Sequence, residues 1–247
     1  MSWGDQVFRY CERAHDAAFW AEPFNAASNV GFLVAAALGA ARLVRQNRSS
    51  APAERTPGAG ASCLVALVAL IGIGSFLFHT TATRWARLAD VVPIGLFMVA
   101  YLIFALRVFL EWSWNRVALV VVLFLAASAV TAAIKCPTRL VGLTGYVREP
   151  CLNGTMSYVP ALATLLLVGS LLRERHPAGR QMLRAAGLFL VAMLLRWIDM
   201  KTCPWTVLLG HPRGTHALWH LLNAATLWVL LRAAIDSRHH RRSLDGC

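Results

Sequence analysis

The chain has 247 residues, of which 57% are hydrophobic and 15% are charged. A soluble domain has roughly 45–50% apolar and about 25% charged residues, so the composition excludes a soluble globular domain, a disordered chain and a collagen-like chain. The net charge of +12 comes from 24 Lys and Arg against 12 Asp and Glu. Arginines that flank apolar spans account for such an excess, and no stretch interleaves basic and aromatic residues as a nucleic-acid-binding face does. The composition therefore predicts an integral membrane protein that does not bind nucleic acid.

A membrane-spanning helix needs about 20 consecutive, mostly apolar residues. Seven stretches qualify, and they predict an all-α protein that forms a seven-transmembrane-helix bundle as a single domain over residues 1–247. Residues 1–23 precede the first span, and a polar tail at 236–247 follows the last. In chain order the predicted spans are about 24–43, 62–82, 89–110, 117–135, 152–172, 182–200 and 214–234.

An odd number of spans places the two termini on opposite sides of the membrane. The loops on the side of the C-terminus hold 14 Lys and Arg, whereas those on the side of the N-terminus hold 10. Because these residues are enriched on the cytoplasmic side, we expect the N-terminus outside and the C-terminus in the cytoplasm. Cys11, Cys136, Cys151 and Cys203 then all lie outside. They allow two disulfides, Cys136 with Cys151 and Cys11 with Cys203, with free thiols as the alternative.

Three histidines are expected at one depth, at the outer end of the bundle. His79 ends the second span, whereas His216 and His220 open the seventh and, being four residues apart, share one helix face. Asp90 opens the third span, and Ser75 lies four residues before His79. Unpaired polar groups are costly at this depth, so the three imidazoles predict a metal site, with hydrogen bonds between packed helices as the alternative.

Three protein ligands with water in the fourth position are the arrangement of a catalytic zinc ion, which lowers the pKa of that water to about 7. We therefore expect zinc at His79, His216 and His220. Asp90 is placed to take or relay the proton. Ser75 is placed to donate a hydrogen bond to a developing oxyanion.

A second group of carboxylates precedes the first span. Glu12, Asp16 and Glu22 fall within eleven residues. Oxygen-only clusters of this kind suit calcium, which also accepts backbone carbonyls as ligands. The alternative is a solvated acidic segment anchored at the membrane interface by Phe19 and Trp20. The residues alone leave both interpretations open.

Taken together, these motifs resemble the alkaline ceramidase family, within the wider superfamily of seven-span hydrolases that includes the progestin and adipoQ receptors. The resemblance covers nearly the whole chain. It rests on CE…AEPFNAASN before and into the first span, GIGSFLFHTTATRWARLADVVP across the second and third, WIDMKTC at the end of the sixth, and HALWH in the seventh. It implies a zinc-dependent hydrolase that cleaves the amide bond of ceramide or a related N-acyl lipid, giving a fatty acid and a sphingoid base or amine.

The sequence departs from the family pattern at two positions. Arg9 stands where animal members carry an acidic ligand, and Val91 follows Asp90 where eukaryotic members carry a Glu. The short chain and Arg-rich loops favour a bacterial member in the inner membrane, acting on ceramide or another N-acyl lipid. The resemblance also implies a role for each matching residue. It implies zinc ligation by His79, His216 and His220, and catalysis by Ser75 and Asp90. It further implies calcium ligation by Glu12, Glu22, Asp16 and the carbonyl of Tyr10, and a disulfide between Cys11 and Cys203.

Two functions from other classes remain as alternatives. A non-catalytic seven-helix lipid receptor or sensor would use the zinc structurally, which favours a closed site with four protein ligands. A small transporter or channel would need polar residues through both halves of the bundle, whereas the inner halves of the spans are apolar. The sequence predicts neither the oligomeric state nor a regulatory role for calcium.

Overall fold

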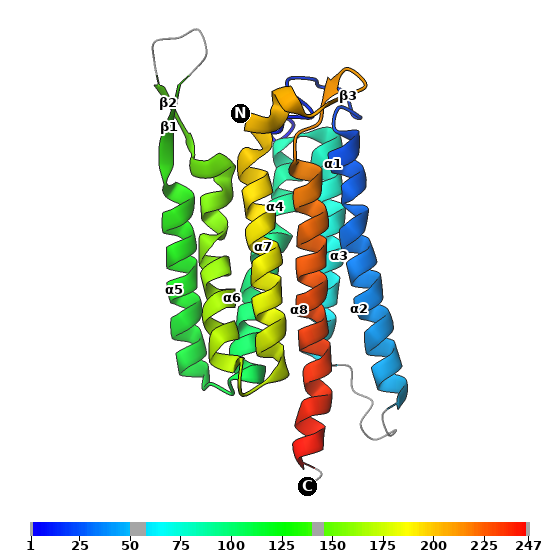
Figure 1. Ribbon diagram of the computed structural model, residues 1–247, viewed down its shortest axis with the longest axis vertical. Coiled ribbons are helices and arrows are strands. Elements are labelled where there is room, and N and C mark those ends of the chain that lie inside the picture. The colour runs from blue at the N-terminus through cyan, green and yellow to red at the C-terminus, as the bar shows by residue number, and fades with distance from the viewer. Residues whose placement is uncertain (1, 50–57, 140–145, 246–247) are drawn as a thin grey trace.

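A computed structural model describes residues 2–49, 58–139 and 146–245 of the chain. Within these residues, seven helices are long and apolar enough to cross a membrane, which confirms the predicted seven-helix bundle (Figure 1). Some spans combine two or more consecutive helical elements. The α-helices are α1 (Pro23–Ser28), α2 (Val30–Ser49), α3 (Ala59–Thr81), α4 (Arg84–Phe104), α5 (Trp114–Ala133), α6 (Val159–Leu172), α7 (Pro177–Thr202) and α8 (His216–Asp245). The other helical elements are a π-helix, η2 (Ala105–Phe109), and two 3-10 helices, η3 (Cys151–Tyr158) and η4 (Cys203–Trp205).

The spans are longer than the hydrophobic pattern alone predicts. Helix α4 begins at Arg84, so Asp90 lies well inside the third span, whereas the predicted span begins at residue 89. Helix α8 continues to Asp245, so the polar tail extends the last helix by several turns beyond the apolar stretch. Hydropathy detects only the apolar part of a helix, whereas backbone hydrogen bonding continues through polar residues with good helix propensity.

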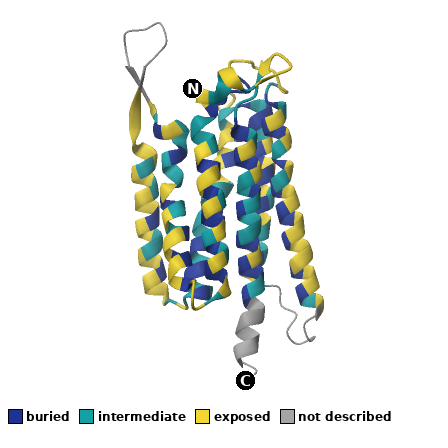
Figure 2. Cartoon of the chain, viewed as in Figure 1, coloured by how far each residue is buried: buried dark blue, intermediate teal, exposed yellow. Residues whose placement is uncertain are grey.

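Consecutive helices of the bundle pack against one another from α2 to α8, and α8 closes the ring by packing against α2 as well as α7. Figure 1 shows the N-terminal segment and the loop before α8 at one end of the bundle, and the C-terminus at the other. We call the first of these the N-terminal end. Figure 2 shows exposed residues along the outward faces of the helices. Many of these are large apolar side chains, such as Leu119, Val122 and Leu167, as expected for a surface in contact with lipid.

Among the described residues, two pairs of short antiparallel strands and two disulfides lie at the N-terminal end. The strands are β1 (Lys135–Arg139) paired with β2 (Tyr146–Pro150), and β3 (Val207–Leu208) paired with β4 (His211–Pro212). Cys136 is bonded to Cys151 at the base of the first hairpin, and Cys11 to Cys203 between the N-terminal segment and the end of α7. Both pairings that the cysteines allow are therefore present. The second disulfide fixes the N-terminal segment over the open end of the ring.

Helices α3 and α4 approach each other so closely that only glycine fits at one position. A Cβ atom at Gly74 would lie 1.9 Å from the carbonyl oxygen of Ala89. The neighbours of this contact are Ser75 and Asp90, so the close approach brings their two helix faces together. Both side chains are almost fully buried, with 2% and 7% of their surface exposed.

Candidate metal centre and lipid cavity

Three imidazole rings meet inside the N-terminal end of the bundle. One nitrogen from each of His79, His216 and His220 lies within 4.8 Å of the other two, and all three side chains are buried. The ring centroids are 4.5 Å apart for His216 and His220, 4.7 Å for His79 and His220, and 5.2 Å for His79 and His216. Ligands of a tetrahedral zinc ion at about 2.05 Å are about 3.3 Å apart, so small side-chain movements suffice to hold one ion.

The first turn of α8 is held in place by a carboxylate from α7. Asp199 Oδ1 accepts hydrogen bonds from the backbone N–H groups of Thr215, at 2.8 Å, and His216, at 3.0 Å. Its other oxygen accepts from the N–H of Cys11 at 3.2 Å. Gly214, with φ of +66°, makes the preceding turn, where a Cβ atom would clash with Asp199. Asp199 thus caps α8 and fixes the start of the helix that supplies two of the three histidines.

Two of the imidazoles are oriented by hydrogen bonds at the nitrogen opposite the shared centre. His79 Nδ1 lies 2.5 Å from Glu22 Oε2, and His220 Nδ1 lies 2.7 Å from the hydroxyl of Ser28. His79 Nε2 and His216 Nδ1 are buried without any hydrogen-bond partner among the described residues. Leaving a buried nitrogen unpaired is costly, and carboxylate-bound histidine is a common support for a metal ligand. The donor set therefore fits a divalent ion such as zinc.

Glu22, which orients His79, is itself fixed by neighbours. Its Oε1 accepts from Arg13 Nε at 2.5 Å, and its Oε2 also accepts from Asn25 Nδ2 at 3.0 Å. Burial alone would raise the pKa of the Glu22 carboxyl, but the nearby His79 and the hydrogen bonds from His79, Asn25 and Arg13 hold that pKa below its ordinary value. The carboxylate is therefore ionised at neutral pH, which favours a proton on Nδ1 of His79 and a free lone pair on Nε2.

Arg13 makes the fullest set of hydrogen bonds at this end of the molecule, and its side chain is fully buried. Besides Glu22, its guanidinium donates to the carbonyl oxygens of Asp16, Ala18, His79 and Thr80, at 2.9 to 3.1 Å. Five bonds use all five N–H donors of an arginine. The side chain therefore joins the N-terminal segment to the last turn of α3, which carries His79.

The residues expected to bind calcium lie in the same segment. The carboxylate of Glu12 accepts from the backbone N–H groups of Phe24 and Asn25 and from Arg213 Nη1 at 3.1 Å. Burial raises the pKa of the Glu12 carboxyl, and these hydrogen bonds oppose the rise. Asp16 Oδ1 accepts from the N–H of Ala18, and the carbonyl of Tyr10 accepts from the N–H of Ala14. An arginine thus contacts each of the two glutamates, and calcium binding stays a prediction.

Ser75 and Asp90 lie beside the three histidines. The hydroxyl of Ser75 lies close to the carboxylate of Asp90, which also interacts electrostatically with His79. The two side chains and His216 and His220 line one cavity. The five residues predicted for metal binding and catalysis are therefore brought into one site.

Tyr10 forms part of the wall of this site. Its ring stacks on His216, with the centroids 3.8 Å apart, and its hydroxyl accepts a hydrogen bond from Arg196 at 3.3 Å. Burial raises the pKa of the Tyr10 phenol to about 12 although Arg196 acts in the opposite direction, so the phenol is neutral at physiological pH. The sequence pointed to Tyr10 for its carbonyl, whereas the structure places its ring against a metal-ligand candidate.

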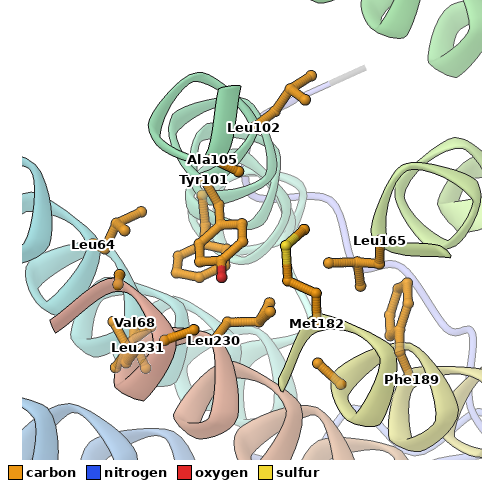
Figure 3. Packing of buried hydrophobic residues seen from close by; sticks show 14 of the residues in the cluster. Leu64, Val68, Tyr101, Leu102, Ala105, Leu165, Met182, Phe189, Leu230 and Leu231 are labelled. Carbon is orange, nitrogen blue, oxygen red and sulfur yellow. The ribbon is translucent and has the colours of Figure 1, made fainter. Parts of the chain in front are cut away.

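A cavity of about 310 Å³ runs from the histidines into the bundle, a size in the range of small-molecule sites. Its lining on α8 extends from His216 to Leu230, about 21 Å along the helix at 1.5 Å per residue. One leaflet of a bilayer has about 15 Å of hydrocarbon, so a long acyl chain fits this length. Figure 3 shows the side chains of Tyr101, Met182 and Leu165 in the buried hydrophobic cluster, and all three also line the cavity.

The resemblance motifs contain several supporting residues whose roles were not predicted. Ser28 and Asn25 belong to AEPFNAASN, and Asp199 belongs to WIDMKTC. Polar residues within or beside apolar spans were the available signal, since such residues need partners. Their partners lie up to 192 residues away in sequence, which no local pattern reveals.

Comparisons with known proteins bear on the whole chain. The family model described as Ceramidase matches residues 7–245. The match includes every residue assigned above to the metal centre and the cavity. A search of the curated proteins finds no significant match.

Proposed function

Because the chain belongs to the Ceramidase family, we propose that it is a zinc-dependent membrane hydrolase that cleaves the N-acyl bond of ceramide or a related N-acyl lipid. The products are a free fatty acid and a sphingoid base or another amine. The observation that carries the proposal is the buried group of three histidines at the polar end of an apolar cavity. A metal centre beside an apolar cavity is suited to an amide that carries a long acyl chain.

His79, His216 and His220 would hold the ion. A zinc ion bound there supplies Lewis acidity and a water whose pKa is about 7. The group contains three ligating side chains among the described residues, which supports a position open to substrate. A lipid receptor with a structural zinc is the second candidate function, and a fourth protein ligand would favour it.

Asp90 and Ser75 supply the remaining chemistry. We assign the proton transfer to the Asp90 carboxylate, which takes a proton from the water that adds to the amide carbon and delivers it to the nitrogen as the C–N bond breaks. The Ser75 hydroxyl, which lines the cavity beside Asp90, can donate to the oxygen of the amide as negative charge develops there. The acyl chain extends along the cavity, away from water.

We also propose that the N-terminal end with the metal centre faces the extracytoplasmic side, and that the protein resides in a bacterial inner membrane. Two disulfides at this end support an oxidising compartment. Calcium at Glu12 and Glu22 is kept as a second expected cofactor. An ion there would have to share or replace the guanidinium contacts of Arg13 and Arg213.

The test is release of fatty acid from ceramide and other N-acyl lipids by the purified protein, measured by mass spectrometry. We expect turnover by the wild type and none by His220→Ala. His211→Ala is a matched control, because His211 lies exposed in β4, outside the cavity. Equal fatty-acid release by wild type and His220→Ala would refute metal-dependent amide hydrolysis.

A further inference from the structure

The cavity wall carries more positive charge than the hydrolysis of a neutral amide requires. Four cationic side chains line it: Arg9 in the N-terminal segment, Arg87 on α4, Lys135 on β1 and Arg196 on α7. Asp90 is the one carboxylate among the described lining residues. The four cations come from four separate elements, so the arrangement is a property of the folded site and not of one charged segment.

Arg196 is held by aromatic rings and not by a carboxylate. Its guanidinium carbon lies 5.6 Å from the centroid of Tyr10 and 5.3 Å from that of Trp219, and a third ring, Tyr158, is 5.7 Å away. Its Nε is buried without a hydrogen-bond partner. Asp90 and Asp199 act on it electrostatically. Within the described residues, however, it forms no ion pair. Arg196 as a whole is half-buried, and its Nη1 donates to the Tyr10 hydroxyl, so the unpaired Nε is left for an anion in the cavity to complete.

Arg9 and Arg87 add to the positive charge that Arg196 places on the cavity wall. Arg9 is half-buried. Burial lowers the pKa of its guanidinium, and the nearby Arg87 and Arg196 lower it further, whereas Tyr10 and Glu149 act in the opposite direction. Arg87 lies three residues before Asp90, on the same face of α4. Neither arginine forms an ion pair within the part of the chain that the structure describes. Because three guanidinium groups without ion pairs line one cavity, they offer charged donors to an anion that enters it.

This positive group lies next to the reacting position. The ring of Tyr10 contacts His216 and also lies beneath the guanidinium of Arg196. The anion of a bound molecule would therefore lie about one aromatic ring away from the metal centre, close to the amide that is cleaved. Hydrolysis of an uncharged N-acyl lipid releases an amine that becomes a cation, which this wall repels. A leaving amine that carries its own anionic group becomes a zwitterion.

We propose, on the basis of the function proposed above, that the preferred substrate is an N-acyl lipid whose amine portion bears a carboxylate, sulfonate or phosphate close to the amide, and that Arg196, Arg9 and Arg87 bind this anion. Arg196 binds it directly, beside the ring of Tyr10. Arg9 and Arg87 draw it in from the cavity mouth. Anionic phospholipids of the bilayer share this chemistry, and the experiment separates the two sources.

The experiment compares N-oleoyl ethanolamine, N-oleoyl glycine and N-oleoyl taurine, which share one acyl chain, as substrates of the full-length protein in neutral detergent. We expect kcat/KM to be at least tenfold higher for the two anionic lipids, and Arg196→Gln and Arg87→Gln to remove this preference mainly through KM. Lys201→Gln is the control, because it removes one charge at the same end of the molecule but does not line the cavity. Equal kcat/KM for the three lipids leaves amide hydrolysis standing and overturns the anionic class.

A second arm uses no turnover. Calorimetric binding of dodecyl sulfonate and dodecanol to the wild type is expected to favour the sulfonate at least tenfold, with the preference lost in Arg196→Gln. If no lipid is hydrolysed, the proposed function fails, but the binding measurement still tests whether the cavity prefers an anion. Addition of anionic phospholipid that raises turnover of all three substrates equally, without a head-group preference, would assign the cations to the bilayer and overturn the proposal.

Discussion

Replacing Glu22 with Gln tests how the protein prepares its metal centre. Glu22 accepts hydrogen bonds from three groups: Nδ1 of His79, Nδ2 of Asn25 and Nε of Arg13. A glutamine has one acceptor oxygen and one NH₂ group, so at least one of these donors would face another donor. His79 would also lose the charge that keeps its proton on Nδ1. Loss of such a partner behind a metal ligand costs about 10- to 100-fold in affinity, or about 1.4–2.7 kcal/mol.

The assay is a zinc titration of purified Glu22→Gln against a fluorescent chelator, with helix content checked by circular dichroism. Asp16→Asn is the matched control. It changes the charge of the same segment by the same amount, but Asp16 is exposed, and its side chain accepts only from the backbone N–H of Ala18 among the described residues. We expect weaker zinc binding only for Glu22→Gln. Wild-type affinity in Glu22→Gln would show that His79 does not depend on this carboxylate.

Three further predictions address the proton, the cavity and the N-terminal segment. Asp90→Asn is expected to retain zinc and lose most turnover, and unchanged turnover would remove Asp90 from the mechanism. Leu165→Trp is expected to fill the inner cavity and lower kcat/KM for long-chain lipids more than for short-chain lipids. An equal effect on both would place the acyl chain elsewhere. If calcium binds at Glu12 and Glu22, we expect it to raise the unfolding temperature of the wild type, and to raise that of Arg213→Gln further because a competing guanidinium is removed from Glu12. An unchanged unfolding temperature in both proteins would contradict calcium binding at these glutamates.

The fold and the grouping of the three histidines could be predicted because both follow from the membrane. Seven apolar stretches define seven helices, and alternating span direction puts the end of the second span and the start of the seventh on one side. His79, His216 and His220 therefore had to lie at one depth. Close approach of the helices, which sequence does not specify directly, turns equal depth into contact. Gly74 is an example, since its lack of a side chain mattered only once Ala89 was placed opposite it.

The support of the centre could not be predicted from spacing. Glu12 and Glu22 look like a pair of oxygen ligands in the sequence, whereas in the structure each contacts an arginine, and Glu22 also orients His79. Whether these carboxylates bind a metal ion or a guanidinium depends on which side chains from other parts of the fold reach them. Arg213 is 201 residues away from Glu12, so its contact is a result of helix packing and the disulfide-held N-terminal segment.

The metal content of the purified protein tests the central claim most directly. Inductively coupled plasma mass spectrometry is expected to find close to one zinc per chain in the wild type and almost none in the His216→Ala, His220→Ala double variant, with His211→Ala as the control. Full zinc content in the double variant, while its helix content matches the wild type, would contradict binding by these imidazoles.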